Sequence, residues 1–224
     1  MTDANRRAAL RGLYAITPEV AEAGRLLRLV ESALDGGARI VQFRVKSLAR
    51  RDRLQRAQAL LRLCRGRGVP LIVNDDLDLA QAIGADGVHV GREDPDPRSA
   101  RERLPGAIIG VSCYDQPALA LAAAQAGADY VGVGSVFASR TKPDAARAGL
   151  AALTRARRAV EIPVAAIGGI NAGNAGEAVH AGADMIAVIT ALFDAPDVRA
   201  AARALSQPFN LQIQTHVRTQ PAAI

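Results

Sequence analysis

Two groups of polar residues in this sequence have the types and spacing of an anion-binding site. In the stretch VQFRVKS, Gln42, Arg44 and Lys46 alternate with apolar residues, so that in a strand one amide and two cations share a face. Asp75 and Asp94 each come after a short apolar run, and one or two carboxylates with water and phosphate oxygens are a common ligand set for Mg²⁺. We therefore expect a diphosphate bridged by Mg²⁺ where these residues meet.

The aspartates have a second interpretation as helix N-caps. The segments NDDLDLAQAIG and REDPDPRSA both place Asp directly before a helical pattern, and an Asp side chain there accepts a hydrogen bond from a free backbone N–H. For Asp76 and Asp78 we favour the cap. For Asp75 and Asp94 we favour the metal, because both lie close to the cations expected at the same strand ends.

A second anion site is predicted in two loops near the end of the chain. The segment GGINAGN, which includes Gly169, follows an apolar run, and glycine lets backbone N–H groups approach a ligand at a helix start. The last apolar run, MIAVIT, ends at Thr190. We expect a monophosphate between these loops; a tight turn without a ligand is the alternative.

These residues need a scaffold that gathers the ends of separate strands. Short β-branched runs alternate with Ala-, Leu- and Arg-rich amphipathic segments along the chain, which is typical of repeated βα units around a parallel sheet. The eight runs cover residues 13–17, 39–44, 70–74, 87–90, 108–112, 130–134, 163–168 and 185–190. Eight units in 224 residues predict a single α/β domain, a (β/α)8 TIM barrel, whose chemistry lies at the C-terminal strand ends.

The same strand ends supply further polar residues. The third run ends at Asn74, the fifth ends at Ser112, and the sixth leads into GSVFASRTKP, which contains Lys142. Among 28 basic residues only Lys46 and Lys142 are lysines. A lysine ammonium is a compact point charge, in contrast to the planar guanidinium of arginine, so these two positions stand out as anion contacts.

A repeated Gly-Ala-Asp precedes three of the runs. The glycines suit the left-handed turn that ends a helix, which places Asp86, Asp129 and Asp184 at the N-terminal rim of the expected barrel. That rim contributes stability in such barrels, and we expect these three acids to be structural.

Composition limits the remaining functions. The net charge of +6 comes from basic residues scattered along helical segments, and with so few aromatic residues for base stacking we expect no nucleic-acid binding. No apolar run is long enough to span a membrane, and MTDANRRAALRG lacks the features of a secretory signal, so we expect a cytoplasmic protein. The barrel should occupy residues 1–206 and a C-terminal tail 207–224. The sequence leaves a homo-oligomer open.

No residues form the pattern of a covalent nucleophile. There is no G-x-S-x-G turn and no Ser-His-Asp arrangement, and the two cysteines, Cys64 and Cys113, lack metal-ligand spacing. His89 lies on a strand face with Gly91, but no second histidine is placed to pair with it. The expected chemistry therefore rests on positioning and charge.

Taken in order, the motifs resemble those of the thiamine phosphate synthases. QFRVK is similar to the family's Q-x-R-x-K, and VNDDLDLAQAIGADGVHVGREDP is similar to its ND…GADGVHLGQED stretch. The segments GVSCYD, GADYVGVGSVFASRTKPDA, AIGGINAGN and AVIT follow in the family's order. The resemblance covers roughly residues 12–205 and is specific because the motifs occur together.

The resemblance implies a transferase of thiamine biosynthesis. Members join 4-amino-5-hydroxymethyl-2-methylpyrimidine diphosphate to 4-methyl-5-(2-phosphoethyl)thiazole, as such or in its carboxylated form, to give thiamine monophosphate and diphosphate. The family's mechanism is dissociative: diphosphate leaves, the pyrimidine stabilises a cation at its methylene carbon, and the thiazole nitrogen captures that cation.

The resemblance also implies the roles of individual residues. It assigns Mg²⁺, the implied cofactor, to Asp75 and Asp94. It assigns the pyrimidine diphosphate to Gln42, Arg44, Lys46, Asn74, Ser112 and Lys142, among which Arg44, Lys46, Ser112 and Lys142 are the expected catalytic residues. It assigns the thiazole phosphate to Ser139, Thr141, Gly169, Ile189 and Thr190.

The sequence departs from the family's pattern at several positions. Ser139 replaces a common Thr and Thr190 replaces a common Ser, so both positions keep a hydroxyl. Arg92 replaces the usual Gln beside Asp94, and Cys113-Tyr114 replaces a frequent Ala-His. Two alternatives to a synthase are a thiazole tautomerase of the same barrel family, which would not need the diphosphate residues, and a non-catalytic thiamine-phosphate binding protein.

Overall fold

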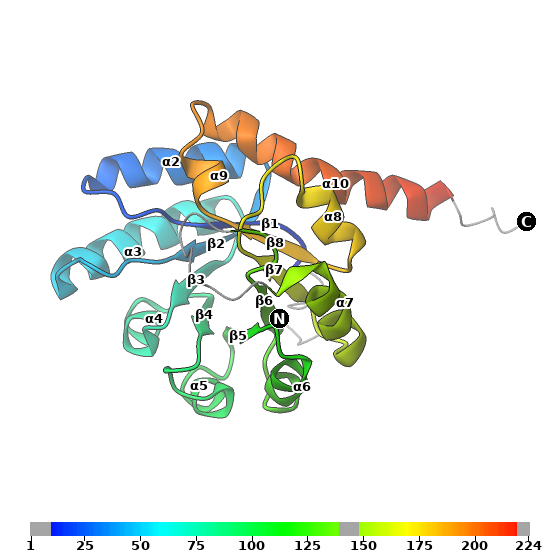
Figure 1. The fold of residues 1–224 in the computed structure, drawn as a ribbon. Helices are drawn as coiled ribbons and strands as arrows, with labels where there is room; N and C mark the ends of the chain where they lie inside the picture. Colours follow the sequence, from blue (N-terminus) through cyan, green and yellow to red (C-terminus); the bar gives the residue numbers. More distant parts are fainter. Residues whose placement is uncertain (1–9, 139–147, 219–224) are drawn as a thin grey trace, which may run out of the picture.

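The computed structural model describes residues 10–138 and 148–218, with side chains as far as residue 210. Eight parallel strands pair in chain order and close on themselves, so the predicted (β/α)8 barrel is confirmed (Figure 1). The strands are β1 (Gly12–Ile16), β2 (Ala38–Phe43), β3 (Leu71–Asn74), β4 (Gly87–Val90), β5 (Ile108–Tyr114), β6 (Tyr130–Gly134), β7 (Val164–Ile167) and β8 (Met185–Val188). All eight agree with the predicted runs to within two residues at each end.

Helices surround the strands (Figure 1). They are α2 (Ala23–Asp35), α3 (Arg50–Gly66), α4 (Leu77–Ile83), α5 (Pro97–Arg103), α6 (Pro117–Gln125), α7 (Gly149–Ala159), α8 (Ala175–His180), α9 (Thr190–Phe193) and α10 (Val198–Arg218).

The predicted boundary between barrel and tail, after residue 206, falls inside α10, and Phe209 beyond it is buried in the core. The chain thus packs against the barrel past residue 206; the role of residues 207–224 as a tail stays a prediction. No helix in the described ranges is long and apolar enough to cross a membrane.

The strands are apolar on both faces because both faces are covered. One core cluster lies between strands and helices and includes Leu13 and Val41; a second lies inside the barrel and includes Tyr14 and Ile40. Successive strand residues therefore alternate between the two clusters, as the two-residue period of a strand requires. Only a few polar side chains, Gln42 and His89 among them, are buried.

The three Gly-Ala-Asp repeats form the same bond pattern at the N-terminal rim. Each Asp accepts a hydrogen bond from the first or second residue of the preceding odd-numbered strand and pairs with an arginine of the helix that comes before that strand. The sets are Asp86 with Leu71 N and Arg65, Asp129 with Ile109 N and Arg101, and Asp184 with Val164 N and Arg157. The structural role expected for these acids is confirmed.

Arg101→Met is expected to destabilise the barrel by about 2 kcal/mol. Asp129 is 1% exposed, and Arg101 both pairs with it at 2.5 Å and donates to three carbonyls, of Pro105, Ala107 and Gly127. The substitution removes the cation that pairs with the buried Asp129 carboxylate, and the partial exposure of Arg101 reduces the loss. Thermal unfolding should show a Tm lower by about 4–8 °C. Arg98→Met, on the exposed side of the same helix, should leave Tm unchanged.

Candidate active site

The loops after β2, β3 and β4 bring the predicted metal and diphosphate residues together. Asp75 directly follows β3, and its carboxylate lies close enough to that of Asp94, in the loop after β4, for the two groups to interact. Asn74, at the end of β3, and the positive charge of Arg44, at the end of β2, also act on the Asp75 carboxylate. Two carboxylates, one amide and one guanidinium thus converge at the mouth of the barrel, the opening at the C-terminal strand ends.

The two carboxylates repel each other in the absence of a cation. Partial removal from water and the neighbouring carboxylate of Asp94 raise the pKa of Asp75 to about 6, against the lowering effects of Asn74 and Arg44. One oxygen of Asp94 also accepts a hydrogen bond from Gly91 N at 2.7 Å, which fixes that side chain. A pair of carboxylates held this close fits a hard divalent cation, which would stabilise both in the ionised form.

Neighbouring aspartates take the helix caps. Asp76 accepts from Leu79 N at the start of α4, as predicted, and Asp96 accepts from two amides at the start of α5. Asp75 and Asp94 are therefore not needed as caps. The cap predicted for Asp78 is wrong: Asp78 lies in the first turn of α4 and its carboxylate pairs with Arg103 at 2.6 Å.

The face predicted for the VQFRVKS stretch is only partly correct. Strand β2 ends at Phe43, so Arg44 and Lys46 lie in the following loop instead of on a strand face. Gln42 does point into the barrel, where it is 2% exposed and donates to the hydroxyl of Tyr14 at 2.7 Å. Arg44 is half-buried and Lys46 is exposed.

Two residues that sequence reasoning missed hold this loop. The Thr17 hydroxyl accepts from Arg44 N at 3.0 Å and lies 3.2 Å from Arg44 O. Glu19 accepts from Lys46 N at 3.1 Å and from the Ser47 hydroxyl at 2.8 Å. The loop after β1 therefore fixes the backbone that carries both cations. No signal in the sequence indicated these contacts, because they join residues 27 or 28 positions apart.

The predicted monophosphate loops are shaped by close contacts between backbones. Gly168 and Gly169 both have positive φ, of 95° and 66°, and a side chain at either would overlap the loop after β6 at Ser135 or Ala138. Glycine is therefore required here for packing as well as for any ligand. Thr190 begins α9, directly after β8, so the C-terminal ends of β7 and β8 lie next to each other as expected.

The asparagines of GGINAGN restrict which amides remain for a ligand. Asn174 accepts from Asn171 N and donates to Gly169 O, and Asn171 accepts from Gly173 N. Two amides of this turn thus already have side-chain partners. Phosphate contacts would fall to the glycine pair and to the start of α9, where Ile189 stands at the N-cap position and provides no side-chain hydrogen bond.

Three predicted site residues, Ser139, Thr141 and Lys142, lie outside the described residues. The described part of the loop reaches Ala138 on one side and resumes at Ala148, whose N–H donates to Ser135 O at 2.8 Å. The roles of these three residues therefore stay predictions.

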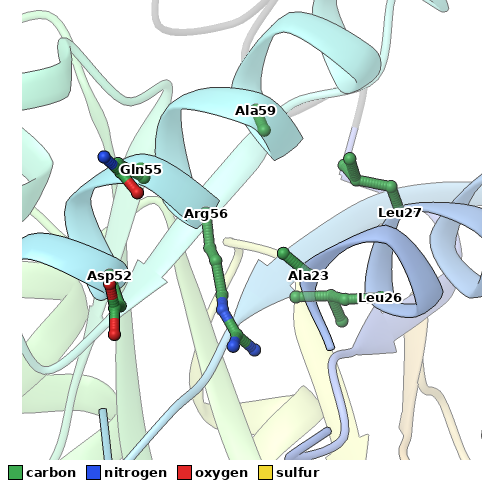
Figure 2. Close-up of a pocket in the computed structure, with 7 residues that line it drawn as sticks. All are labelled: Ala23, Leu26, Leu27, Asp52, Gln55, Arg56 and Ala59. Atoms are coloured by element: carbon green, nitrogen blue, oxygen red, sulfur yellow. The ribbon is translucent and has the colours of Figure 1, made fainter. Parts of the chain in front are cut away.

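A hollow of about 280 Å³ on the outer surface lies between α2 and α3, away from the carboxylate pair (Figure 2). Arg56 extends into it and donates to the carbonyls of Val20 and Ala21 at 2.6 and 2.5 Å. Because its guanidinium is engaged by these carbonyls, Arg56 holds the loop after β1 in place. This hollow brings together none of the predicted site residues.

Comparisons with known proteins identify the family of this chain. The sequence profile of the family described as thiamine monophosphate synthase matches residues 13–192. The thiamine-phosphate synthase of Chromobacterium violaceum is 56% identical over 198 residues, which are 88% of this chain and 95% of the relative. The chain belongs to the thiamine monophosphate synthase family. The relative of the same name from Thiobacillus denitrificans is 55% identical, over 88% of this chain and 94% of its own.

A solved structure of the family has the same barrel. The thiamine phosphate pyrophosphorylase from Pyrococcus furiosus superposes with a TM-score of 0.83 at 40% identity, over 92% of this chain and 98% of its own.

Two departures of this chain from the family's pattern contact each other: the guanidinium of Arg92 lies 4.6 Å from the ring centroid of Tyr114. The positive charge that Arg92 adds near Asp94 thus interacts with the aromatic face of Tyr114.

Proposed function

We propose that this chain catalyses the family reaction, in which a pyrimidine diphosphate and a thiazole phosphate form thiamine monophosphate and diphosphate. The observation that carries the proposal is the pair Asp75 and Asp94 beside Arg44 at the mouth of the barrel. Identities of 56% and 55% to named thiamine-phosphate synthases over most of the chain support it. Its substrates are small molecules of thiamine biosynthesis, and we place the reaction in the cytoplasm.

The diphosphate end of the site would have two cations on the loop after β2 beside a metal site on the loops after β3 and β4. Asp75 and Asp94 would hold Mg²⁺, which when bound offsets the negative charge of the diphosphate. Arg44 and Lys46 lie on a loop whose backbone is fixed by Thr17 and Glu19, so the backbone that carries both charges is in place before substrate binds. Prepositioned charges stabilise a leaving group without a reorganisation cost during the reaction.

The described residues provide no covalent step. Both cysteines are buried, and burial raises the pKa of each thiol to about 12, so neither Cys64 nor Cys113 is a thiolate at neutral pH. Burial lowers the pKa of His89 to about 4, so that imidazole is neutral. This suits a dissociative substitution, in which the protein aligns two substrates and stabilises the departing diphosphate.

The thiazole phosphate is assigned to the loops after β7 and β8. Gly169, Ile189 and Thr190 lie at adjacent strand ends, on the side of the barrel opposite β3 and β4. The phosphate loops of barrels of this kind commonly follow the seventh and eighth strands. The two substrates would therefore meet over the centre of the mouth.

The experiment that tests the proposal is an assay of both products. Purified protein is incubated with both substrates and Mg²⁺, and thiamine monophosphate and diphosphate are measured over time. A synthase releases the two in equal amounts. Rearrangement of the thiazole phosphate without diphosphate release would identify a tautomerase, and binding without any product would identify a carrier or sensor; either result would overturn the proposal.

Lys142→Arg is expected to lower kcat about tenfold, equivalent to roughly 1.4 kcal/mol. The substitution keeps the charge but replaces a compact ammonium by a wider planar group that cannot make the same contact with a departing diphosphate. Because the interaction strengthens as charge develops, the loss should appear in kcat, with the KM for thiazole phosphate unchanged. Steady-state kinetics measure both. Full turnover, or a defect confined to that KM, would remove Lys142 from the diphosphate.

A further inference from the structure

Five polar side chains from five strands form one continuous chain of hydrogen bonds inside the barrel. Gln42 Nε2 lies 2.7 Å from the Tyr14 hydroxyl, which lies 2.7 Å from the Tyr130 hydroxyl. The Tyr130 hydroxyl lies 2.9 Å from His89 Nδ1, and His89 Nε2 lies 2.9 Å from Ser112 Oγ. The chain crosses the barrel, and its two ends are residues assigned to the pyrimidine diphosphate.

The barrel interior is built to hold this chain. Tyr14, Gln42, His89 and Tyr130 are each at most 5% exposed. Gly110, on β5, makes the space: a methyl group at that position would overlap the ring and hydroxyl of Tyr130. Buried polar groups that are fully hydrogen-bonded specify one arrangement, whereas an unpaired one is costly.

The first bond sets the direction of all the others. The amide nitrogen of Gln42 only donates, so the Tyr14 hydroxyl accepts from it and has its own hydrogen left for Tyr130. Tyr130 then accepts from Tyr14 and donates to His89 Nδ1. An imidazole that accepts at Nδ1 and is neutral carries its proton on Nε2, and that proton is donated to Ser112 Oγ.

We infer that Tyr14, Tyr130 and His89 are positioning residues that hold the Ser112 hydroxyl as a hydrogen-bond donor toward the diphosphate. Because Ser112 Oγ accepts from His89, its own hydrogen is left for another acceptor. An anionic oxygen is the acceptor that such a donor suits. The inference rests on the proposed function for the identity of the ligand, but the proton arrangement is a property of the protein alone.

The opposite arrangement is equally definite. With the Gln42 amide turned by 180°, its oxygen would accept from Tyr14 and every bond in the chain would reverse. His89 would then carry its proton on Nδ1, and Ser112 would donate to His89 instead of to the substrate. In both arrangements one ring nitrogen of His89 accepts a hydrogen bond and the ring is neutral, so the tautomer alone separates them.

Nitrogen NMR of His89 in the protein without substrates tests the direction. A H180Q/H216Q background leaves His89 as the sole imidazole, and His180 is exposed on α8. Long-range ¹H–¹⁵N spectra distinguish the two neutral tautomers by which ring nitrogen is protonated. We expect the Nε2–H form. An Nδ1–H form or a charged ring at neutral pH would overturn the inference while leaving the proposed reaction intact.

Two single-atom variants test the consequence for substrate. Tyr130→Phe removes the donor to His89 Nδ1, and we expect loss of the single tautomer and a roughly tenfold fall in kcat/KM for the pyrimidine diphosphate. The KM for thiazole phosphate should not change. Tyr14→Phe separates Tyr130 from Gln42, so the direction of the chain is no longer set and the His89 spectrum should show both neutral tautomers.

The matched control is Thr154→Val, which removes a hydroxyl on α7 that bonds to Leu150 O and Ala181 O. It should leave both the His89 spectrum and the kinetics unchanged. If Tyr130→Phe keeps the Nε2–H tautomer and full kcat/KM, or lowers kcat/KM for both substrates equally, the three residues are structural only and the inference fails.

Discussion

Asp94→Asn is expected to lower kcat about a thousandfold, equivalent to roughly 4 kcal/mol. The substitution keeps the shape of the side chain and its acceptor for Gly91 N, but removes one of two carboxylates proposed to hold Mg²⁺. Asp75→Asn should have a similar effect for the same reason. Steady-state assays at several Mg²⁺ concentrations would measure the loss and show a higher Mg²⁺ requirement for the residual activity.

Asp86→Asn is the matched control at the opposite rim. Asp86 accepts from Leu71 N and pairs with Arg65, so its substitution should lower stability slightly and leave turnover nearly unchanged. If Asp86→Asn reduced kcat as much as Asp94→Asn, the assignment of the active face would be wrong.

A stability measurement separates loss of the site from loss of the fold. The pKa of Asp75 is raised from 3.8 to about 6, so ionising it costs folding free energy at neutral pH; that cost declines as the pH falls below about 6 and is gone below about 3.8. Asn removes the cost and also tolerates the positive φ of 63° at this position. Because Asp75 is exposed, we expect a gain of only about 1 kcal/mol and a Tm about 2–4 °C higher for metal-free Asp75→Asn.

Arg44→Met is expected to lower kcat/KM for the pyrimidine diphosphate about a hundredfold, roughly 2.7 kcal/mol. Arg44 is the cation whose charge acts on Asp75, and its loss removes a charged contact to the diphosphate. The backbone of residue 44 should stay in place, because Thr17 bonds to its N–H and C=O and not to its side chain.

Kinetics with each substrate varied in turn would test this prediction. The KM for thiazole phosphate should remain within about twofold, since that substrate is assigned to the other side of the mouth. Arg51→Met, exposed on α3, is the charge-matched control and should behave as wild type. An equal loss for both substrates in Arg44→Met would contradict a diphosphate-specific role.

The fold was predictable because its signals are local. Each apolar run such as YVGVG, and each Gly-Ala-Asp repeat, indicates one βα unit, and eight such units predict the barrel. The course of the chain after Phe43 was less predictable. The alternation in VQFRVKS continues past the end of the strand, because the loop residues Arg44 and Lys46 happen to keep the two-residue period.

The site was predictable where its residues follow strands directly, as Asp75 and Asn74 do. It was not predictable where a role depends on contacts between strands far apart in sequence. His89 had no second histidine near it in the sequence, yet its partners are Tyr130 and Ser112, 41 and 23 positions away. Such pairing is set by the closure of the barrel, which places inward residues of all strands within reach of one another.

Manganese binding followed by electron paramagnetic resonance tests the central claim most directly, namely that Asp75, Asp94 and Arg44 form one site for a divalent cation and a diphosphate. We expect wild type to bind Mn²⁺ more tightly when the pyrimidine diphosphate is present, because binding of two linked ligands is reciprocal. Asp94→Asn should lose the bound Mn²⁺, Arg44→Met should keep it but lose the tightening by substrate, and Asp86→Asn should match wild type. Unchanged Mn²⁺ binding by Asp94→Asn would contradict the account.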